Sequence, residues 1–256
     1  MNKLLNSKIY KDIVKKKIKC YFVSPHLDDA IFSAGGLINS LTQNKVPATI
    51  INVFTKASRS PYTISVKKFL FSCGYTNADT FYADRIIEDK KATTMANADV
   101  INLGFIDALW RRKGSVGLKK KLSLILPEID YVYPIYRLSI ARGIVSKLDR
   151  NLSDKICSEI GKIIDENSII FYPIAIGGHV DHKIVRDACD KLSIRKIRWS
   201  DYPYSKKDNA DKEYIQTNMI STYKYRPTKF KENLVNAYKS QIKAIFGVDR
   251  EKINRN

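Results

Sequence analysis

The three histidines of this chain lie beside aspartates in two short motifs, "SPHLDDA" and "GGHVDH". The histidines and aspartates of these motifs are His26, Asp28, Asp29, His179, Asp181 and His182. Burying an ionised carboxylate costs several kcal/mol of desolvation free energy unless a nearby cation compensates the charge. Two imidazoles and one carboxylate can hold Zn²⁺ or Fe²⁺ and leave a coordination position open for water. The motifs therefore predict a divalent metal site that activates water, in which one aspartate is a ligand and another is the base.

Each motif is predicted to follow a strand and to open a helix. Short apolar runs predict strands at residues 18–24, 48–54, 100–105 and 168–174. Helical spacing of apolar residues predicts helices at residues 30–41, 65–73, 85–96, 151–167 and 183–192. This alternation favours an α/β protein with a mostly parallel sheet covered on both faces, a Rossmann-like three-layer fold. Ligands bind at the carboxyl ends of the strands in such sheets, so we expect the active site there.

We expect a single domain over residues 1–256, because no internal repeat or low-complexity linker divides the chain. Residues 1–17 are polar and basic and are predicted to form a loosely ordered arm. Residues 114–150, which include "YVYPIYRLS", are predicted to line the mouth of the active site. A terminal helix is expected near residues 230–246.

The chain is strongly basic, with 45 Lys and Arg against 26 Asp and Glu and a formal charge of +19. The basic residues are scattered along the chain, which is more typical of a compositional bias than of a nucleic-acid surface. Binding of nucleic acid is an alternative on charge alone, but it leaves the histidines unexplained and no nucleic-acid partner is expected. A small-molecule substrate that bears a phosphate would suit the same charge.

Signals of cellular location favour the cytoplasm. The longest apolar runs are too short to cross a bilayer, and the N-terminus lacks the apolar core of a signal peptide. Four cysteines lie far apart without a C-x-x-C pair, which is typical of a reducing compartment and of small buried apolar residues. We therefore expect a cytoplasmic protein without a transmembrane segment.

The two motifs resemble those of the PIG-L/LmbE-like family of zinc-dependent N-acetylglucosaminyl deacetylases. "SPHLDDAIFSAGG" is similar to the family's His-Pro-Asp-Asp-Glu box after the first strand, and "GGHVDH" is similar to its His-x-x-His box. "RIIEDKKA", "NLGFID" and "AYKSQ" are similar to further family elements, so the resemblance covers residues 18–245. It implies a hydrolase that releases acetate from an N-acetylglucosamine-type sugar in a conjugate, such as a glycolipid, nucleotide sugar, glycoside or polysaccharide precursor.

The same resemblance implies roles for the residues of the two motifs. It makes His26, Asp29 and His182 the ligands of Zn²⁺, for which Fe²⁺ is the alternative. It makes Asp28 the general base that activates water. It makes His179 the residue that stabilises the oxyanion and helps to protonate the departing amine.

Supporting residues follow from the resemblance as well. Asp181 is implied to orient a histidine, and Arg85 and Asp107 are implied to bind sugar hydroxyls or a phosphate. Leu27 and Ala30 stand where the family's first box has Pro and Glu. Neither position is a metal ligand in the family scheme, so the chemistry is expected to remain.

Two other enzymes are alternatives at this point. An amidase of the same family shape that removes a larger acyl group would carry the same motifs and differ only in its pocket. A sugar-nucleotide transferase could use paired aspartates to hold a metal on a diphosphate. The histidines argue against the transferase, because a metal bound to a diphosphate prefers oxygen ligands.

Overall fold

The computed structural model describes residues 4–206, 208–218 and 229–246. The strands are β1 (Cys20–Ser24), β2 (Ala48–Lys56), β3 (Asp99–Ile106), β4 (Ile169–Pro173) and β5 (Arg195–Trp199). The α-helices are α1 (Lys8–Lys16), α2 (Asp29–Gln43), α3 (Ile64–Cys73), α4 (Ala78–Met95), α5 (Gly117–Ser123), α6 (Leu152–Gly161), α7 (Val180–Asp190), α8 (Lys212–Thr217), α9 (Lys229–Val235) and α10 (Lys239–Phe246). Short 3₁₀ helices lie between them, one of them directly after β3.

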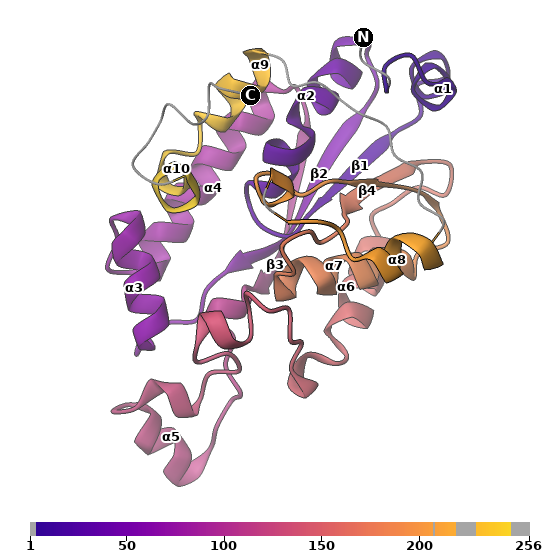
Figure 1. The fold of residues 1–256 in the computed structure, drawn as a ribbon. Coiled ribbons are helices and arrows are strands. Elements are labelled where there is room, and N and C mark those ends of the chain that lie inside the picture. The colour runs from indigo at the N-terminus through magenta and orange to yellow at the C-terminus, as the bar shows by residue number, and fades with distance from the viewer. Residues whose placement is uncertain (1–3, 207, 219–228, 247–256) are drawn as a thin grey trace.

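The strands form one sheet in the order β3-β2-β1-β4-β5, and every pair of neighbours is parallel. The chain builds outward from β1 to β3 and then returns to the other side of β1 to add β4 and β5 (Figure 1). The predicted Rossmann-like α/β fold with a parallel sheet is confirmed. The direction of growth reverses between β1 and β4, and this is the place where open parallel sheets bind ligands.

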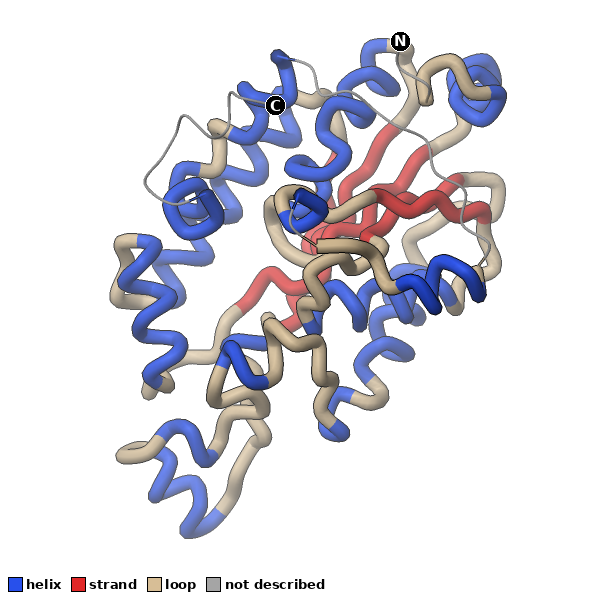
Figure 2. Tube along the Cα trace, in the orientation of Figure 1, coloured by secondary structure: helices blue, strands red, loops and turns tan. Residues whose placement is uncertain are grey.

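The core has two halves, one on each face of the sheet. On one face, Phe22 of β1 stacks on Phe171 of β4, with 4.5 Å between the ring centroids, and α1, α2 and α9 cover them. On the other face, Tyr21 and Val23 pack with α3, α6 and α7. Figure 2 shows helices on both sides of the strands. Because the central strands are buried on both faces, they read in the sequence as continuous apolar runs.

Helix α1 differs from the prediction of a loosely ordered arm at residues 1–17. Ser7 caps this helix by accepting a hydrogen bond from the amide of Tyr10 at 3.2 Å. Ile13 is buried, and the Tyr10 hydroxyl lies 2.7 Å from Oγ of Ser40 on α2. The arm prediction is therefore wrong for residues 8–16, because a capping serine and a buried isoleucine hold a basic segment against the body.

Other differences concern the polar and C-terminal elements. β5 was not predicted, because its sequence RKIRW at the sheet edge is polar and only Trp199 is buried. The helix expected near residues 230–246 is two helices, α9 and α10, which meet near Tyr238. α4 begins at Ala78, well before the predicted start at residue 85, and α6 ends at Gly161, before the predicted end at residue 167.

Within the described residues, no helix combines the length and the apolar character that crossing a bilayer requires. All four cysteines are free, with Cys20 and Cys189 buried and Cys73 and Cys157 partly buried. The single domain over residues 1–256 stays a prediction.

Candidate active site

The two histidine motifs meet at the carboxyl edge of the sheet. The first occupies the loop from β1 into α2, and the second connects β4 with α7. β1 and β4 are paired neighbours, but α2 and α7 pack on opposite faces of the sheet. The two loops therefore diverge and leave a crevice between them, in which their side chains face one another.

A glycine in the second motif allows a close approach at this crevice. Gly177 has a φ of +83°, and a Cβ at this position would lie 3.0 Å from the side chain of Tyr204. Tyr204 lines the cleft and its ring centroid lies 6.1 Å from that of His182. Glycine therefore serves both the turn and the packing of Tyr204 over the motif.

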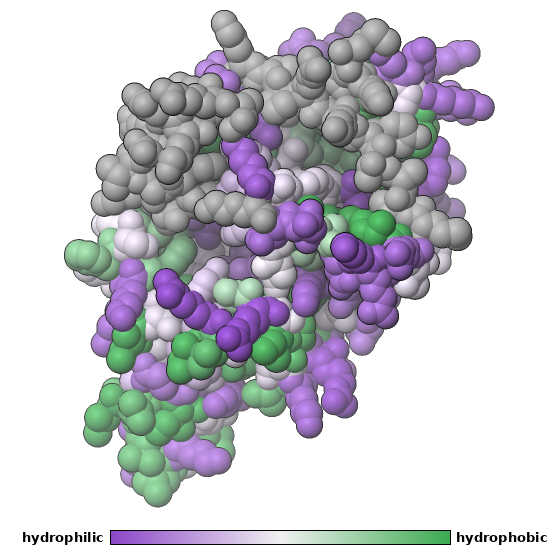
Figure 3. Space-filling model, viewed as in Figure 1, coloured by the Kyte–Doolittle hydropathy of each residue, from purple (hydrophilic) through white to green (hydrophobic). Residues whose placement is uncertain are grey.

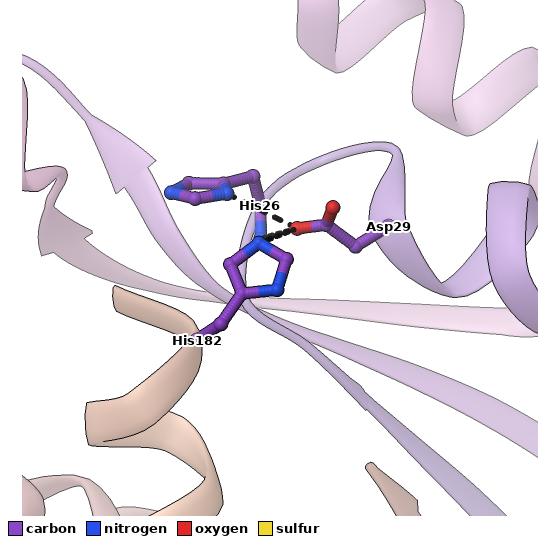
Figure 4. Close-up of side chains that lie close together, drawn as sticks. All are labelled: His26, Asp29 and His182. Atoms are coloured by element: carbon purple, nitrogen blue, oxygen red, sulfur yellow. Dashed lines mark hydrogen bonds and ion pairs between the residues drawn. The ribbon is translucent and has the colours of Figure 1, made fainter. Parts of the chain in front are cut away.

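Three side chains turn their ligand atoms toward one point (Figure 4). Oδ2 of Asp29 lies 3.0 Å from Nδ1 of His26 and 3.3 Å from Nε2 of His182. All three ligand atoms lie within 4.8 Å of one another, and all three residues are buried. This nitrogen and oxygen donor set fits a divalent metal such as zinc or ferrous iron with room for water.

The outer nitrogen of each of these histidines is held by a second carboxylate. Nε2 of His26 lies 3.1 Å from Oδ2 of Asp181, and Nδ1 of His182 lies 2.7 Å from Oδ1 of Asp201. Histidines that bind metals are commonly oriented in this way. A second group of possible ligands, His26, His179 and Asp181, also exists. Its Asp181 is already engaged by Arg111, so this group fits a supporting role better.

The charges around the three side chains favour a cation between them. Burial disfavours the charged forms of the imidazoles, yet Asp29 and Asp201 raise the pKa of His182 to about 10. The pKa of His26 is likewise raised by its hydrogen bonds to Asp181 and Asp29 in spite of burial. Burial opposes ionisation of Asp29, but the two histidines hold its pKa well below the usual range. The surroundings thus stabilise positive charge at this point, and a divalent metal ion fits them.

Asp28 faces the same crevice from the start of α2. It occupies the N-cap position of this helix without making a side-chain cap bond, so its carboxylate is available to the cleft that it lines. Oδ1 of Asp28 lies 3.3 Å from a guanidinium nitrogen of Arg85. Burial raises the pKa of Asp28 although Arg85 opposes the shift. A carboxylate with a raised pKa is a stronger base than an exposed one.

His179 is the N-cap residue of α7. Its Nδ1 accepts a hydrogen bond from the amide of Asp181 at 3.2 Å, so a neutral ring carries its proton on Nε2. Burial and the neighbouring His26 lower the pKa of His179 to about 3. The ring lines the cleft, with its centroid 5.1 Å from that of His26. His179 is therefore a neutral hydrogen-bond donor toward the cleft.

Arg85 and Asp107, predicted to bind substrate, both line the cleft. Each also has a partner within the protein. Arg85 pairs with Asp28, while Asp107 accepts hydrogen bonds from the Tyr82 hydroxyl at 3.0 Å and the Leu109 amide at 2.8 Å. The structure thus brings all eight predicted site residues into one region, with His182 and Asp181 beneath the residues that line the cleft. The remaining walls of the cleft are mainly aromatic and include Trp110, Tyr136, Tyr202 and Tyr204.

Two residues that hold the site together were not predicted from the sequence. Asp201 follows β5 and contacts His182, and it would have been found if the polar strand before it had been recognised. Arg111 forms buried ion pairs with Asp181 and Asp149. No sequence signal marks Arg111, because its partners lie far away in the chain.

Two of the motifs outside the boxes contact each other. Glu88 of "RIIEDKKA" accepts hydrogen bonds from the amide and hydroxyl of Ser240 in "AYKSQ", at 2.9 and 2.6 Å. Asp89 accepts one from the Tyr238 hydroxyl at 2.7 Å. These bonds fix α10 against α4 and bring Gln241 to the lining of the cleft. The C-terminal motif is thereby part of the site.

A comparison with known families identifies this arrangement. The family described as PIG-L: GlcNAc-PI de-N-acetylase matches residues 21–193, more than half of the chain. The chain belongs to this family of deacetylases. The two histidine motifs of the chain lie within the matched region, and both contribute side chains to the candidate site of this PIG-L domain. A search of curated proteins finds no match.

Solved structures show the same fold over nearly the whole chain. The zinc-inhibited form of the teicoplanin deacetylase Orf2 is 20% identical and has a TM-score of 0.70, covering 93% of this chain and 90% of its own. The A40926 pseudoaglycone deacetylase Dbv21 is 20% identical and has a TM-score of 0.60. The match covers 92% of this chain and 87% of the Dbv21 chain. At this identity the likeness establishes the PIG-L fold and no more.

Proposed function

We propose that this PIG-L family protein is a metal-dependent hydrolase that removes the N-acetyl group from an N-acetylglucosamine-type sugar in a conjugate. The observation that carries the proposal is the convergence of His26, Asp29 and His182 on one point beside Asp28 and His179. An amide is a poor electrophile with a poor leaving group, so its hydrolysis requires carbonyl polarisation, an activated water and proton delivery to nitrogen. The cleft offers a group for each requirement.

His26, Asp29 and His182 would hold the metal, which we propose to be Zn²⁺ or Fe²⁺. When bound there, such an ion polarises the amide carbonyl and lowers the pKa of water. The donor atoms fit this task, because they are two nitrogens and one oxygen whose residues are fixed from behind by carboxylates. A fold neighbour named as the zinc-inhibited form of a deacetylase supports metal binding by this fold, but it does not select zinc as the active ion.

Asp28 is the proposed general base. It lines the cleft next to Asp29, and burial raises its pKa. It takes a proton from the attacking water and can then deliver that proton to the departing amine nitrogen. Its ion pair with Arg85 holds the carboxylate in place during both transfers.

His179 is the proposed donor to the oxyanion. Its Nδ1 is occupied as an acceptor, so the proton on Nε2 is available to the oxygen on which negative charge develops. The low pKa of about 3 makes a charged imidazolium unfavourable here. His179 therefore acts as a hydrogen-bond donor, and Asp28 rather than His179 supplies the proton to the amine.

The substrate is proposed to be a sugar conjugate rather than a free sugar. Aromatic side chains around the cleft suit the faces of a sugar ring, and Arg85 and Asp107 at its lining suit hydroxyls or a phosphate. Fold neighbours named as deacetylases of teicoplanin and of the A40926 pseudoaglycone support an amino sugar attached to a larger group.

The proposed cellular location is the cytoplasm, which the four free cysteines support.

The test is acetate release by the purified chain loaded with Zn²⁺ or Fe²⁺. The panel contains N-acetylglucosamine, its phosphate, a nucleotide conjugate and a simple glycoside, and each is also supplied with a longer N-acyl chain. Acetate from at least one N-acetyl compound, lost on chelation and restored by metal, supports the proposal. Release of only the longer acyl groups would make the protein an amidase with another specificity and would contradict the N-acetyl assignment.

A further inference from the structure

A helical hairpin projects from the body of the protein next to the active-site region. Residues 113–130, here called the α5 arm, leave the body after Arg112 and return at Tyr131. An antiparallel bridge pairs Arg112 with Tyr131 at its base, and the amide of Lys113 donates to the carbonyl of Asp130 at 2.6 Å. Figure 1 shows α5 at the far end of this hairpin, away from the sheet. The arm is thus a defined structure with an anchored base.

The arm exposes its apolar side chains instead of burying them. Its exposed large apolar residues, with their exposed fractions, are Val116 (79%), Leu118 (73%), Leu122 (46%), Leu124 (66%), Ile125 (87%) and Leu126 (53%). Figure 3 shows a largely green area over α5, interrupted by purple side chains. A contiguous apolar surface of this kind marks an interaction site, whereas scattered single exposed residues do not.

The charge of the arm limits what can cover it. Arg112, Lys113 and the run Lys119, Lys120 and Lys121 are basic, and the first acidic residue after Arg112 is Glu128. A second copy of this chain docked arm to arm would bring these like charges together, which is unfavourable. Apolar side chains among lysines on a projecting helix are instead typical of segments that lie on anionic membranes.

A second exposed apolar stretch, residues 135–148, follows the arm in the chain. Its apolar residues are Ile135, Leu138, Ile144, Val145 and Leu148, with exposed fractions between 39% and 63%. Arg137, Arg142 and Lys147 lie among them, and no acidic residue occurs between residues 131 and 148. Tyr136 of the same stretch lines the cleft. The second stretch therefore borders the active site.

We propose that the α5 arm and residues 135–148 dock this protein on the surface of an anionic lipid bilayer. The apolar side chains enter the boundary between headgroups and acyl chains, and the basic side chains contact the phosphates. Docking by such a surface is peripheral and reversible and needs no membrane-spanning helix. The inference goes beyond the proposed deacetylation and does not depend on it, because docking requires neither the metal nor the cleft.

The test is flotation of the full chain with vesicles at 0.1 M salt. Vesicles of phosphatidylcholine with three tenths phosphatidylglycerol are compared with vesicles of phosphatidylcholine alone. We expect binding to the anionic vesicles and about tenfold or greater weakening on the neutral ones. Failure to float with the anionic vesicles would overturn the proposal.

Matched variants separate the arm from the general basic charge. Lys119→Gln/Lys120→Gln/Lys121→Gln removes three charges from the arm, and a control with Gln at Lys15, Lys16 and Lys17 removes three at the end of α1. We expect the arm variant to weaken vesicle binding about tenfold or more and the control to change it little. Equal losses would show nonspecific attraction of a basic protein and would overturn the proposal.

A second pair of variants tests the apolar contribution. Leu118→Ser/Ile125→Ser changes two residues of the arm, and Ile9→Ser/Ile87→Ser changes two exposed apolar residues on α1 and α4. Only the arm variant is expected to lose vesicle binding, by about tenfold or more. Size-exclusion chromatography without vesicles tests whether a second copy of the chain covers the arm instead. A dimer that the arm substitutions dissociate, in a protein that does not float, would make the surface a contact between copies.

Discussion

Oδ1 of Asp201 lies 2.7 Å from Nδ1 of His182, and both groups are buried at the carboxyl edge of the sheet. The other oxygen of Asp201 accepts a hydrogen bond from the amide of Ile176 at 2.9 Å. The carboxylate is thus fixed by the loop after β4 and in turn fixes the ring. This leaves Nε2 of His182 pointing at Asp29.

Loss of the Asp201 carboxylate should weaken metal binding. Asp201→Ala is expected to lower the affinity for Zn²⁺ by about 10–100-fold, because His182 loses the partner that sets its orientation. The affinity is measured by competition with a chromophoric chelator. Asp208→Ala, which removes a carboxylate from an exposed position, is the control and should bind as the wild type does. Equal affinities of wild type and Asp201→Ala would contradict this role.

Replacing His179 should slow the reaction without removing the metal. His179→Ala is expected to lower kcat by about 10²–10³-fold, which is typical for the loss of one donor to an oxyanion. KM and metal content should change little, because the ring is a donor rather than one of the three proposed ligands. Steady-state kinetics on the best substrate and metal analysis of the same sample check both parts. Loss of the bound metal would instead make His179 a ligand.

Arg111 should stabilise the fold through its buried ion pairs with Asp181 and Asp149. Arg111→Met leaves buried carboxylates without their cation and is expected to lower the free energy of unfolding by about 3–5 kcal/mol. Urea denaturation measures this change. Arg112→Met, at the neighbouring and more exposed arginine, should cost much less. Adding Asp181→Asn to Arg111→Met should recover part of the loss, and no recovery would contradict the pairing.

Asp89 should make stability depend on pH. Burial raises the pKa of Asp89 to about 7, above the value of about 3.9 expected in the unfolded chain. The folded protein therefore binds this proton more tightly, so the contribution of Asp89 favours folding below about pH 4 and is lost as the pH rises to about 7. Asp89→Asn removes this pH-dependent contribution to the free energy of unfolding.

The expected difference between wild type and Asp89→Asn therefore grows with pH. Near pH 4 the two proteins should unfold at similar urea concentrations, because the protonated carboxyl resembles the amide. At pH 8 the variant should be more stable by an amount on the order of 2–4 kcal/mol. Asn52, whose Oδ1 is buried without a partner, can accept from the new amide. Parallel stability curves across this pH range would show that Asp89 ionises normally.

The parts of the site that follow a local rule could be predicted from the sequence. Apolar runs marked the central strands, and the polar motifs after two of them were expected at the carboxyl edge of a parallel sheet. That His26 and His182 bind one metal was implied by the resemblance to the family. Asp201 and Arg111 could not be predicted in this way. Asp201 follows an edge strand whose polar sequence hides it, and Arg111 acts only through contacts that folding creates.

In the proposed mechanism, one metal ion held by His26, Asp29 and His182 is required for deacetylation. The most direct measurement removes metal from the purified chain with a chelator, returns Zn²⁺ in steps, and follows bound metal and acetate release on the same samples. Bound metal and acetate release should rise together and level off at about one ion per chain, and His182→Gln should gain neither. Full acetate release from the metal-free chain, or equal metal binding by His182→Gln, would contradict it.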